Sequence, residues 1–193
     1  ANSYCVTTED VALEDSEETL DTTGFTEAAL FDVDNANVDY AQNVFDKLYP
    51  ASTTKILTAL IALENTDLTD VVTVADEAGV DQFAADESTC GIKAGDKLTM
   101  KDLLYGMLLE SGNDNAAAIA YYISGSMDGF ADLMNQRAKE LLATHSHFVN
   151  SNGLHDEDHY TTAYDLYLIF NECIKHKEFV DIINTNFYTA TIT

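Results

Sequence analysis

A serine and a lysine stand three positions apart in the segment Ser52-Thr53-Thr54-Lys55. At helical spacing their side chains share one face, one turn apart. Burial against an apolar helix lowers the pKa of an ammonium group, so Lys55 can become neutral and remove the proton of Ser52. The N–H groups at the start of the helix can then stabilise an oxyanion. The pattern predicts a nucleophile and its base, although a capping serine followed by a surface lysine gives the same spacing.

A second polar segment, Ser111-Gly112-Asn113, interrupts an otherwise helical pattern. Gly112 favours a break there, and a short loop can present the flanking side chains to a cleft. Ser111 is then suited to relay a proton between Lys55 and a leaving amine, and Asn113 to bind the substrate backbone. An ordinary turn between helices uses the same residue types, so only the combination with the first segment carries weight.

The apolar pattern predicts the elements that position these two segments. A mostly apolar helix over 51–64 follows Pro50, and a helix over 99–110, with Thr99 as its N-cap and Asp102 reaching back, leads to the second segment. Two short apolar runs at 28–33 and 38–42 flank turn residues and predict a β-hairpin. The remaining predictions are strands at 71–74 and 187–193, helices at 115–124, 127–143, 162–173 and 178–183, a short extended stretch at 148–149, and irregular segments at 77–97 and 150–159.

Composition limits the class of protein. The formal net charge is −25, with nine Lys plus Arg against 34 Asp plus Glu, which disfavours nucleic acid and anionic lipid as partners. No apolar run approaches the ~20 residues that span a bilayer. The acidic residues 1–23 are expected to be a flexible or loosely docked leader without a secretory signal, and residues 24–193 one domain.

Four histidines near the C-terminal part of the chain invite a metal-site interpretation: His145, His147, His155 and His159. His155 and His159 would share a face only in a helix, and the preceding Asn152-Gly153 with three acids between the histidines favours a loop instead. We therefore expect neither a metal nor a cofactor.

The cysteines and one acidic pair give weaker indications. Cys5, Cys90 and Cys173 show no C-x-x-C spacing, and their odd number leaves at least one thiol unpaired while a single disulfide stays open. Asp32-x-Asp34 has the start of a calcium loop but lacks the next oxygen ligand and the glycine, so a turn is expected.

Together, the two polar segments resemble those of a known family. Residues 49–55 resemble the nucleophile segment of the D-alanyl-D-alanine carboxypeptidases, the low-molecular-mass penicillin-binding proteins. Residues 109–114 resemble their second motif, with glycine where β-lactamases usually carry aspartate. Residues 148–154, followed by 159–166, resemble a third family stretch, in which Ser151 stands at a position that is usually proline. The resemblance covers residues 24–193.

The resemblance implies an α+β fold, with a helical cluster packed beside an antiparallel sheet and the active site between them. It implies removal of the terminal D-Ala from peptidoglycan stem peptides through an acyl-enzyme on Ser52, with Lys55 and Ser111 as catalytic residues and Asn113 as a substrate-binding residue. β-Lactams would acylate the same serine. The family is exported and works outside the cytoplasmic membrane, so an extracytoplasmic location is expected.

One departure from the family pattern concerns its third motif, Lys-Thr-Gly, which this sequence lacks. We expect the sheet to be incomplete, with the missing strands supplied by a longer parent protein or a separate C-terminal chain. A catalytically silent module that binds wall peptide or senses penicillin is therefore one alternative. A serine β-lactamase is another, although residues 144–165 show no Glu-rich element followed by Asn that would supply its deacylating glutamate.

Overall fold

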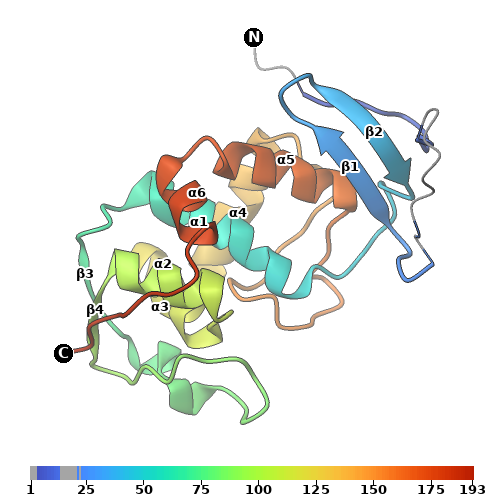
Figure 1. The fold of residues 1–193 in the computed structure, drawn as a ribbon. Coiled ribbons are helices and arrows are strands. Elements are labelled where there is room, and N and C mark those ends of the chain that lie inside the picture. The colour runs from blue at the N-terminus through green and yellow to red at the C-terminus, as the bar shows by residue number, and fades with distance from the viewer. Residues whose placement is uncertain (1–3, 14–20, 22) are drawn as a thin grey trace.

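The computed structural model describes residues 4–13, 21 and 23–193. In chain order the elements are β1 (Ala28–Asp32), β2 (Asn37–Gln42), a 3₁₀ turn (Ala51–Thr53), α1 (Thr54–Asn65), β3 (Val71–Thr73), two further 3₁₀ turns (Asp76–Ala78 and Val80–Gln82), β4 (Lys97–Thr99), α2 (Met100–Leu109), α3 (Asn113–Ser124), α4 (Met127–Glu140), α5 (Ala163–Cys173) and α6 (Lys177–Ile183). The helices form a cluster with the β1–β2 hairpin at one side (Figure 1). No helix in the described part of the chain has the length and apolar character needed to cross a bilayer.

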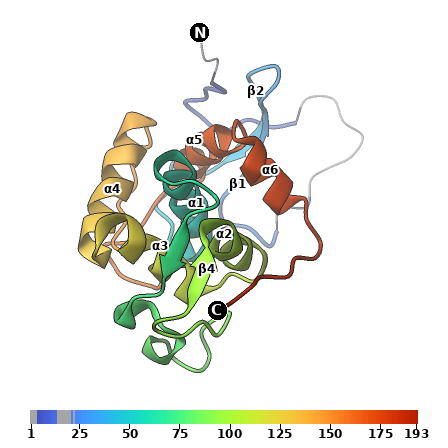
Figure 2. The ribbon, with the colours of Figure 1, turned by 90° about the vertical axis from the view of Figure 1, so that its left-hand side faces the viewer.

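Helix α1 is the centre of the cluster and packs against α2, α3, α4 and α5, as the rotated view shows (Figure 2). Its side chains Leu57, Leu60 and Ile61 are at most 2% exposed. Burying each such side chain contributes about 1.5–3 kcal/mol, which explains why this helix is apolar on nearly every face. Helix α1, which begins just after the predicted nucleophile, is thereby held by four neighbouring helices.

The β1–β2 hairpin confirms the strand prediction for this region. Its strands are antiparallel, with a register shift between Leu30 and Phe31. The carboxylate of Asp32 accepts the N–H groups of Asp34 and Asn35, so the acidic pair forms the expected turn. Phe31 stacks on Tyr167 of α5 with ring centroids 4.1 Å apart, which attaches the hairpin to the helical cluster.

The second sheet contains one strand that the sequence pattern missed. Strand β3 was expected, but its antiparallel partner β4 begins at Lys97, at the end of the segment predicted to be irregular. Three residues are too few to show an alternating pattern. Thr99 ends β4 and also caps α2, where its side chain and Asp102 form the predicted capping box.

The predicted strand at 187–193 is wrong, because no strand is assigned there. The backbone pairs only at Thr193, which exchanges both hydrogen bonds with Lys97. Tyr188 instead stacks on Tyr105 of α2, with centroids 3.8 Å apart, and donates to Asp102. Tyr188 is the residue of this segment that is partly buried, and it packs on a helix rather than beside a strand, so the β-prone alternation is not matched by strand pairing.

Part of the predicted leader packs on the domain. Val11 forms a backbone bridge with Ala41 of β2, and Cys5 is fully buried. The N–H of Cys5 donates to the hydroxyl of Tyr167, and the hydroxyl of Tyr164 donates to the carbonyl of Cys5. These contacts attach residues 4–13 to the hairpin and α5, while residues 1–3, 14–20 and 22 lie outside the described residues.

Candidate active site

Ser52 and Lys55 lie together at the start of the central helix. Ser52 is exposed in the 3₁₀ turn that precedes α1, rather than in the α-helix itself, and Lys55 is 2% exposed. The Nζ atom of Lys55 lies 3.5 Å from Ser52 Oγ. It also donates to Asn113 Oδ1 and to the carbonyl of Asn152, each at 2.8 Å. The lysine is therefore held by neutral oxygen atoms beside an accessible hydroxyl.

These surroundings change the acid–base behaviour of the lysine. Burial lowers the pKa of Lys55 to about 8, because an ammonium group loses its hydration there. With that pKa, about a tenth of the lysine is neutral at pH 7, whereas an ordinary lysine is neutral in well under one molecule in a thousand. Neutral Lys55 beside Ser52 is the arrangement that a lysine general base requires.

Ser111 reaches the same place from the turn between α2 and α3. Its Oγ donates to Ser52 Oγ at 3.0 Å rather than to Lys55, the partner that the expected proton relay suggested. Ser111 has φ +57°, a left-handed conformation that costs about 1–2 kcal/mol for a residue with a side chain. Asn113 is the first residue of α3, which starts two residues earlier than predicted. The two polar segments therefore converge on one site.

Besides the two polar segments, the loop before α5 also borders the site. The side chain of Thr58 donates to the carbonyl of Ser151, and the hydroxyl of Ser151 donates to the carbonyl of Ala116. These bonds fix the loop to α1 and α3, and so orient the Asn152 carbonyl that accepts from Lys55. Sequence analysis assigned no role to this backbone carbonyl, because a main-chain acceptor leaves no mark in residue type.

Gly153 lets this loop approach the backbone of Ala51 and Ser52 closely. Its φ is +90°, and a Cβ atom there would lie 1.8 Å from the carbonyl oxygen of Ala51. Only glycine fits such a backbone contact. The glycine of the Asn152-Gly153 pair was therefore the feature of the sequence that could have indicated close backbone packing beside Ser52.

An apolar hollow of about 430 Å³ opens beside Ser52. Helices α1, α2, α5 and α6 and the second polar segment supply its lining, which consists of Ser52, Thr53, Lys55, Ile56, Met107, Leu108, Ser111, Phe170, Phe179 and Ile183. Both hydroxyls of the site face this hollow, so it offers room for an apolar part of a substrate next to the reacting atoms.

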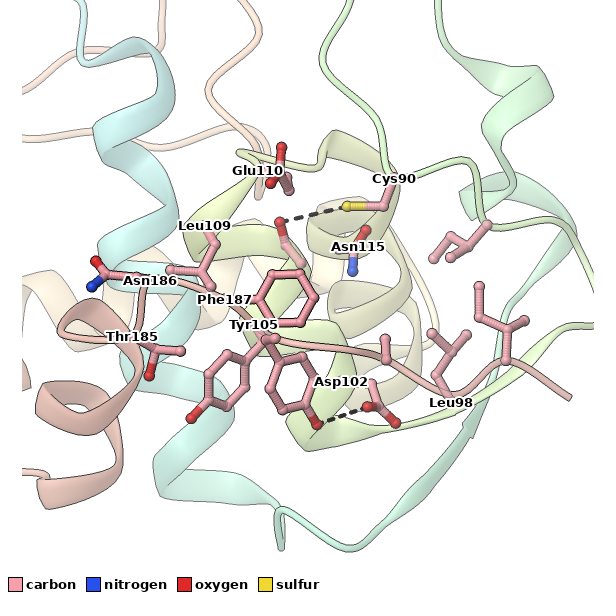
Figure 3. Close-up of a pocket in the computed structure, with 15 residues that line it drawn as sticks. Cys90, Leu98, Asp102, Tyr105, Leu109, Glu110, Asn115, Thr185, Asn186 and Phe187 are labelled. Carbon is pink, nitrogen blue, oxygen red and sulfur yellow. Dashed lines mark hydrogen bonds between the residues drawn. The ribbon is translucent and has the colours of Figure 1, made fainter.

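A second hollow, of about 470 Å³, lies behind the turn between α2 and α3 (Figure 3). It is covered by the segment after α6, with Cys90, Asn115 and Tyr188 among its lining residues. None of the four predicted site residues lines it, so we do not assign it to the reaction.

The histidines take structural positions. His159 is 1% exposed, its Nδ1 accepts the N–H of Val149, and its Nε2 lies 2.7 Å from Thr54 Oγ1. The hydrogen-bond pattern assigns the proton to Nε2, and burial lowers the pKa of His159 to about 4. Within the described residues, no three His, Cys, Asp or Glu side chains are grouped as metal ligands would be. All three cysteines are free thiols.

Comparison with known proteins places this geometry in a family. A family model described as D-alanyl-D-alanine carboxypeptidase matches residues 15–192. The chain is 35% identical over 160 residues to D-alanyl-D-alanine carboxypeptidase DacF of Bacillus subtilis, which covers 82% of this chain and 41% of that protein. It is 38% identical over 135 residues to DacB2 of Mycobacterium tuberculosis, which covers 69% of this chain and 45% of that protein.

Solved structures of penicillin-binding proteins and D-alanyl-D-alanine carboxypeptidases show the same likeness. The D-alanyl-D-alanine carboxypeptidase DacD of Francisella tularensis superposes with a TM-score of 0.79 at 30% identity, over 92% of this chain and 43% of that one. Penicillin-binding protein 6B of Escherichia coli gives a TM-score of 0.75 at 27% identity, over 82% of this chain and 53% of that one. The chain thus spans about half or less of each of these four relatives.

The predicted α+β architecture, with helices clustered beside antiparallel strands, is confirmed by this likeness. The two polar segments lie within the matched residues and converge in space as the resemblance implied. This chain belongs to the D-alanyl-D-alanine carboxypeptidase family.

Proposed function

We propose that this chain carries the nucleophile and base of a serine D,D-carboxypeptidase, which removes the terminal D-Ala from peptidoglycan stem peptides. The observation that carries the proposal is the environment of Lys55, which is buried among neutral oxygens and lies 3.5 Å from the exposed Ser52 hydroxyl. A lysine in such surroundings gives up its proton near neutral pH and can then accept another from a serine.

In the first step, neutral Lys55 takes the hydroxyl proton of Ser52. The Ser52 oxygen attacks the carbonyl carbon of the penultimate D-Ala, and the carbonyl electron pair moves to oxygen. The resulting oxyanion develops beside the start of α1, where backbone N–H groups and the helix dipole favour negative charge. Each preorganised donor of this kind contributes about 10²–10³ in rate.

In the second step, the C–N bond breaks and the terminal D-Ala leaves as an amine. That nitrogen needs a proton, and Ser111 is suited to pass one from protonated Lys55, since its hydroxyl already bonds Ser52 Oγ. Lys55 returns to its neutral form and Ser52 is left as an ester. Water activated by the same base then hydrolyses the ester, which releases the shortened peptide and restores Ser52.

Asn113 serves two partners in this scheme. Its Oδ1 accepts from Lys55 Nζ, and that leaves its Nδ2 group to donate to a carbonyl of the substrate backbone. The apolar hollow beside Ser52 suits the methyl groups of a D-Ala-D-Ala terminus. β-Lactams, which acylate the serine of this family, are the matching inhibitors.

Two further expectations belong to the whole protein. We propose that a Lys-Thr-Gly strand outside the present sequence, on the same polypeptide or a separate chain, supplies a cation for the substrate carboxylate. We also propose an extracytoplasmic location, because the substrate is part of the cell wall.

The proposal is tested by labelling with fluorescent penicillin, on residues 1–193 and on a version extended to the length of the relatives. Mass spectrometry should locate the adduct on Ser52, and Ser52→Ala should remove it. Ser126→Ala, which changes only the cap of α4, is the matched control and should label fully. Chelation with EDTA should leave labelling unchanged.

Other outcomes identify the alternatives. An adduct on Ser111 or full labelling of Ser52→Ala refutes the assignment of the nucleophile. Rapid loss of the label indicates a β-lactamase. No label on either length of chain indicates a silent module that binds wall peptide or penicillin.

A further inference from the structure

A buried carboxylate, Asp114, directly follows the second polar segment and takes no part in the proposed chemistry. It is 0% exposed, and both oxygens are fully used by backbone N–H groups. Oδ1 accepts from Cys90 and Asn115 at 2.9 and 3.0 Å, and Oδ2 accepts from Gly91 and Ile92 at 2.8 and 3.0 Å. Four N–H donors use the full acceptor capacity of a carboxylate.

Three of these donors, Cys90, Gly91 and Ile92, are consecutive residues of a segment distant in sequence. The same segment also forms hydrogen bonds with the turn between α2 and α3. The carbonyl of Ser88 accepts from the N–H of Asn113 at 2.8 Å, and the hydroxyl of Ser88 donates to the carbonyl of Glu110 at 2.7 Å. Cys90 Sγ donates to the carbonyl oxygen of Gly106 at 3.6 Å, and Figure 3 marks this hydrogen bond of Cys90 with a dashed line. Residues 88–92, called the clamp segment below, thus bind the turn just before Ser111 and just after it.

The turn needs such support, because its conformation is strained and its position matters. Ser111 is held at φ +57° at the end of α2, where the N–H of Gly112 donates to the carbonyl of Gly106 over a long 3.3 Å. Its hydroxyl must stay 3.0 Å from Ser52 Oγ, and Asn113 Oδ1 must stay 2.8 Å from Lys55 Nζ. Misplacement of a reacting group by about 1 Å can cost ~100-fold in rate.

We propose that Asp114 is a positioning residue, whose carboxylate holds the clamp segment against the turn and thereby fixes Ser111 and Asn113 at the nucleophile. It acts through the backbone and touches neither substrate nor the reacting atoms. This inference rests on the proposed function of Ser52, and its test includes one measurement that does not depend on that function.

The first variant is Asp114→Asn. Its amide NH₂ group must face either the N–H groups of Gly91 and Ile92 or those of Cys90 and Asn115, so half of the acceptor positions become donors. Asp165→Asn is the matched control. Asp165 is 1% exposed and also accepts a distant N–H, that of His145, but it lies at the start of α5 and does not contact the turn.

Amide hydrogen exchange measures the clamp directly. Asp114→Asn should raise the exchange rate of residues 88–92 by ~10-fold or more, while Asp165→Asn leaves those amides as in the parent. Unchanged exchange at 88–92 in Asp114→Asn overturns the proposal. This measurement stands even if Ser52 proves not to be the nucleophile, because amide exchange requires no acylation.

The pH profile of acylation separates positioning from an electrostatic role. On folded protein of the extended chain, Asp114→Asn should lower the acylation rate by ~10-fold or more at every pH, with the midpoint unchanged near the pKa of Lys55. A shifted midpoint, or an equal loss in Asp165→Asn, contradicts a positioning role.

A second variant covers the case in which Asp114→Asn does not fold. Gly91 is exposed with φ +79°, so Gly91→Pro removes one N–H of the clamp and demands a different φ. It should raise exchange at 88–92 and lower acylation in the same direction as Asp114→Asn. Full acylation with a released clamp segment would show that the turn needs no support.

Discussion

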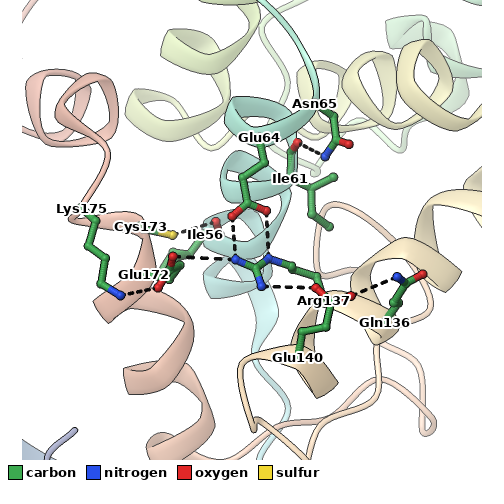
Figure 4. Close-up of polar contacts among 10 residues, drawn as sticks. All are labelled: Ile56, Ile61, Glu64, Asn65, Gln136, Arg137, Glu140, Glu172, Cys173 and Lys175. Carbon is green, nitrogen blue, oxygen red and sulfur yellow. Dashed lines mark hydrogen bonds and ion pairs between the residues drawn. The ribbon is translucent and has the colours of Figure 1, made fainter. Parts of the chain in front are cut away.

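Two cations at opposite ends of α1 have opposite surroundings. Lys55, at its start, bonds neutral oxygens, and burial lowers its pKa to about 8. Arg137 of α4, at its far end, forms two hydrogen bonds with the carboxylate of Glu64 and lies within 3.3 Å of Glu140 and 3.8 Å of Glu172 (Figure 4). The hydrogen bonds to Glu64, with the neighbouring charges, raise the pKa of Arg137.

The difference separates a cation that links helices from a cation that we propose to act as a base. The sequence has 34 acidic residues, yet the described part of the chain brings no carboxylate into hydrogen-bond or ion-pair contact with Lys55. Arg137 ties α1, α4 and α5 together as a permanent charge, and its guanidinium does not titrate in the physiological range. Lys55 is placed so that it can lose its charge.

The largest expected effect comes from making the Lys55 cation permanent. Lys55→Arg keeps the positive charge but removes a group that can deprotonate, so penicillin acylation should fall by ~100-fold or more. Lys139→Arg, on the partly exposed face of α4, is the control and should acylate normally. Acylation by Lys55→Arg within threefold of the parent would exclude Lys55 as the base.

Giving Lys55 a carboxylate, as Arg137 has, should have the next largest effect. In Asn113→Asp an anion replaces a neutral oxygen 2.8 Å from Nζ, and an adjacent opposite charge raises the pKa of a lysine by about 1–3 units. The neutral fraction at pH 7 then falls, so acylation should drop by about 10–100-fold and its midpoint should move to higher pH.

The pH profile is the decisive part of that experiment. Acylation should rise with pH up to the pKa of Lys55 and then level off, in the parent and in Asn113→Asp alike. If the variant is slow but keeps the parent midpoint, the loss stems from geometry rather than charge. Asn113→Ala provides that geometric reference.

Displacing the Asn152-Gly153 loop, whose carbonyl accepts from Lys55, tests the contribution of the backbone to the site. Gly153→Ala puts a Cβ atom against the Ala51 carbonyl and should destabilise the fold by about 2–4 kcal/mol, because the strained loop must shift. Gly125→Ala shares a positive φ but meets open space, and should cost about 1 kcal/mol. Thermal unfolding compares them, and equal losses would show that close packing at residue 153 is unimportant.

The smallest effect is expected at the other end of α1. Arg137→Met removes a partly exposed ion-pair cluster and should lower the free energy of unfolding by about 1 kcal/mol, since exposed pairs contribute little. The loss should shrink in high salt, and acylation below the melting range should stay at the parent rate. A large drop in acylation would mean that this cluster also supports the site.

Sequence reasoning proposed Ser52, Lys55, Ser111 and Asn113 as site residues from the combination of two motifs and their family resemblance. The structure brings these four side chains together. That reasoning missed the contributions of the main chain, such as the Asn152 carbonyl on Lys55, because every residue type supplies one.

For the fold, too, sequence reasoning identified elements marked by particular side chains and missed elements that depend on the main chain. The cap Thr99 marked a helix start correctly, because its side-chain oxygen has a defined task there. The short strand at Lys97 gave no pattern, and the segment before Thr193 stacks Tyr188 on α2 instead of forming a strand. Periodicity reports which face is covered but not by what.

The central claim is that burial lowers the pKa of Lys55 far enough for it to act as a base, and the titration of Lys55 itself tests this most directly. In a protein with ¹³C-labelled lysine, NMR follows the Cε signal of each lysine against pH, and Lys55→Met identifies the signal of interest. We predict a midpoint about two units below the ordinary ~10.4 of lysine, near the value that burial imposes. A midpoint at or above 10 would show that Lys55 stays charged, and would contradict its role as the base for Ser52.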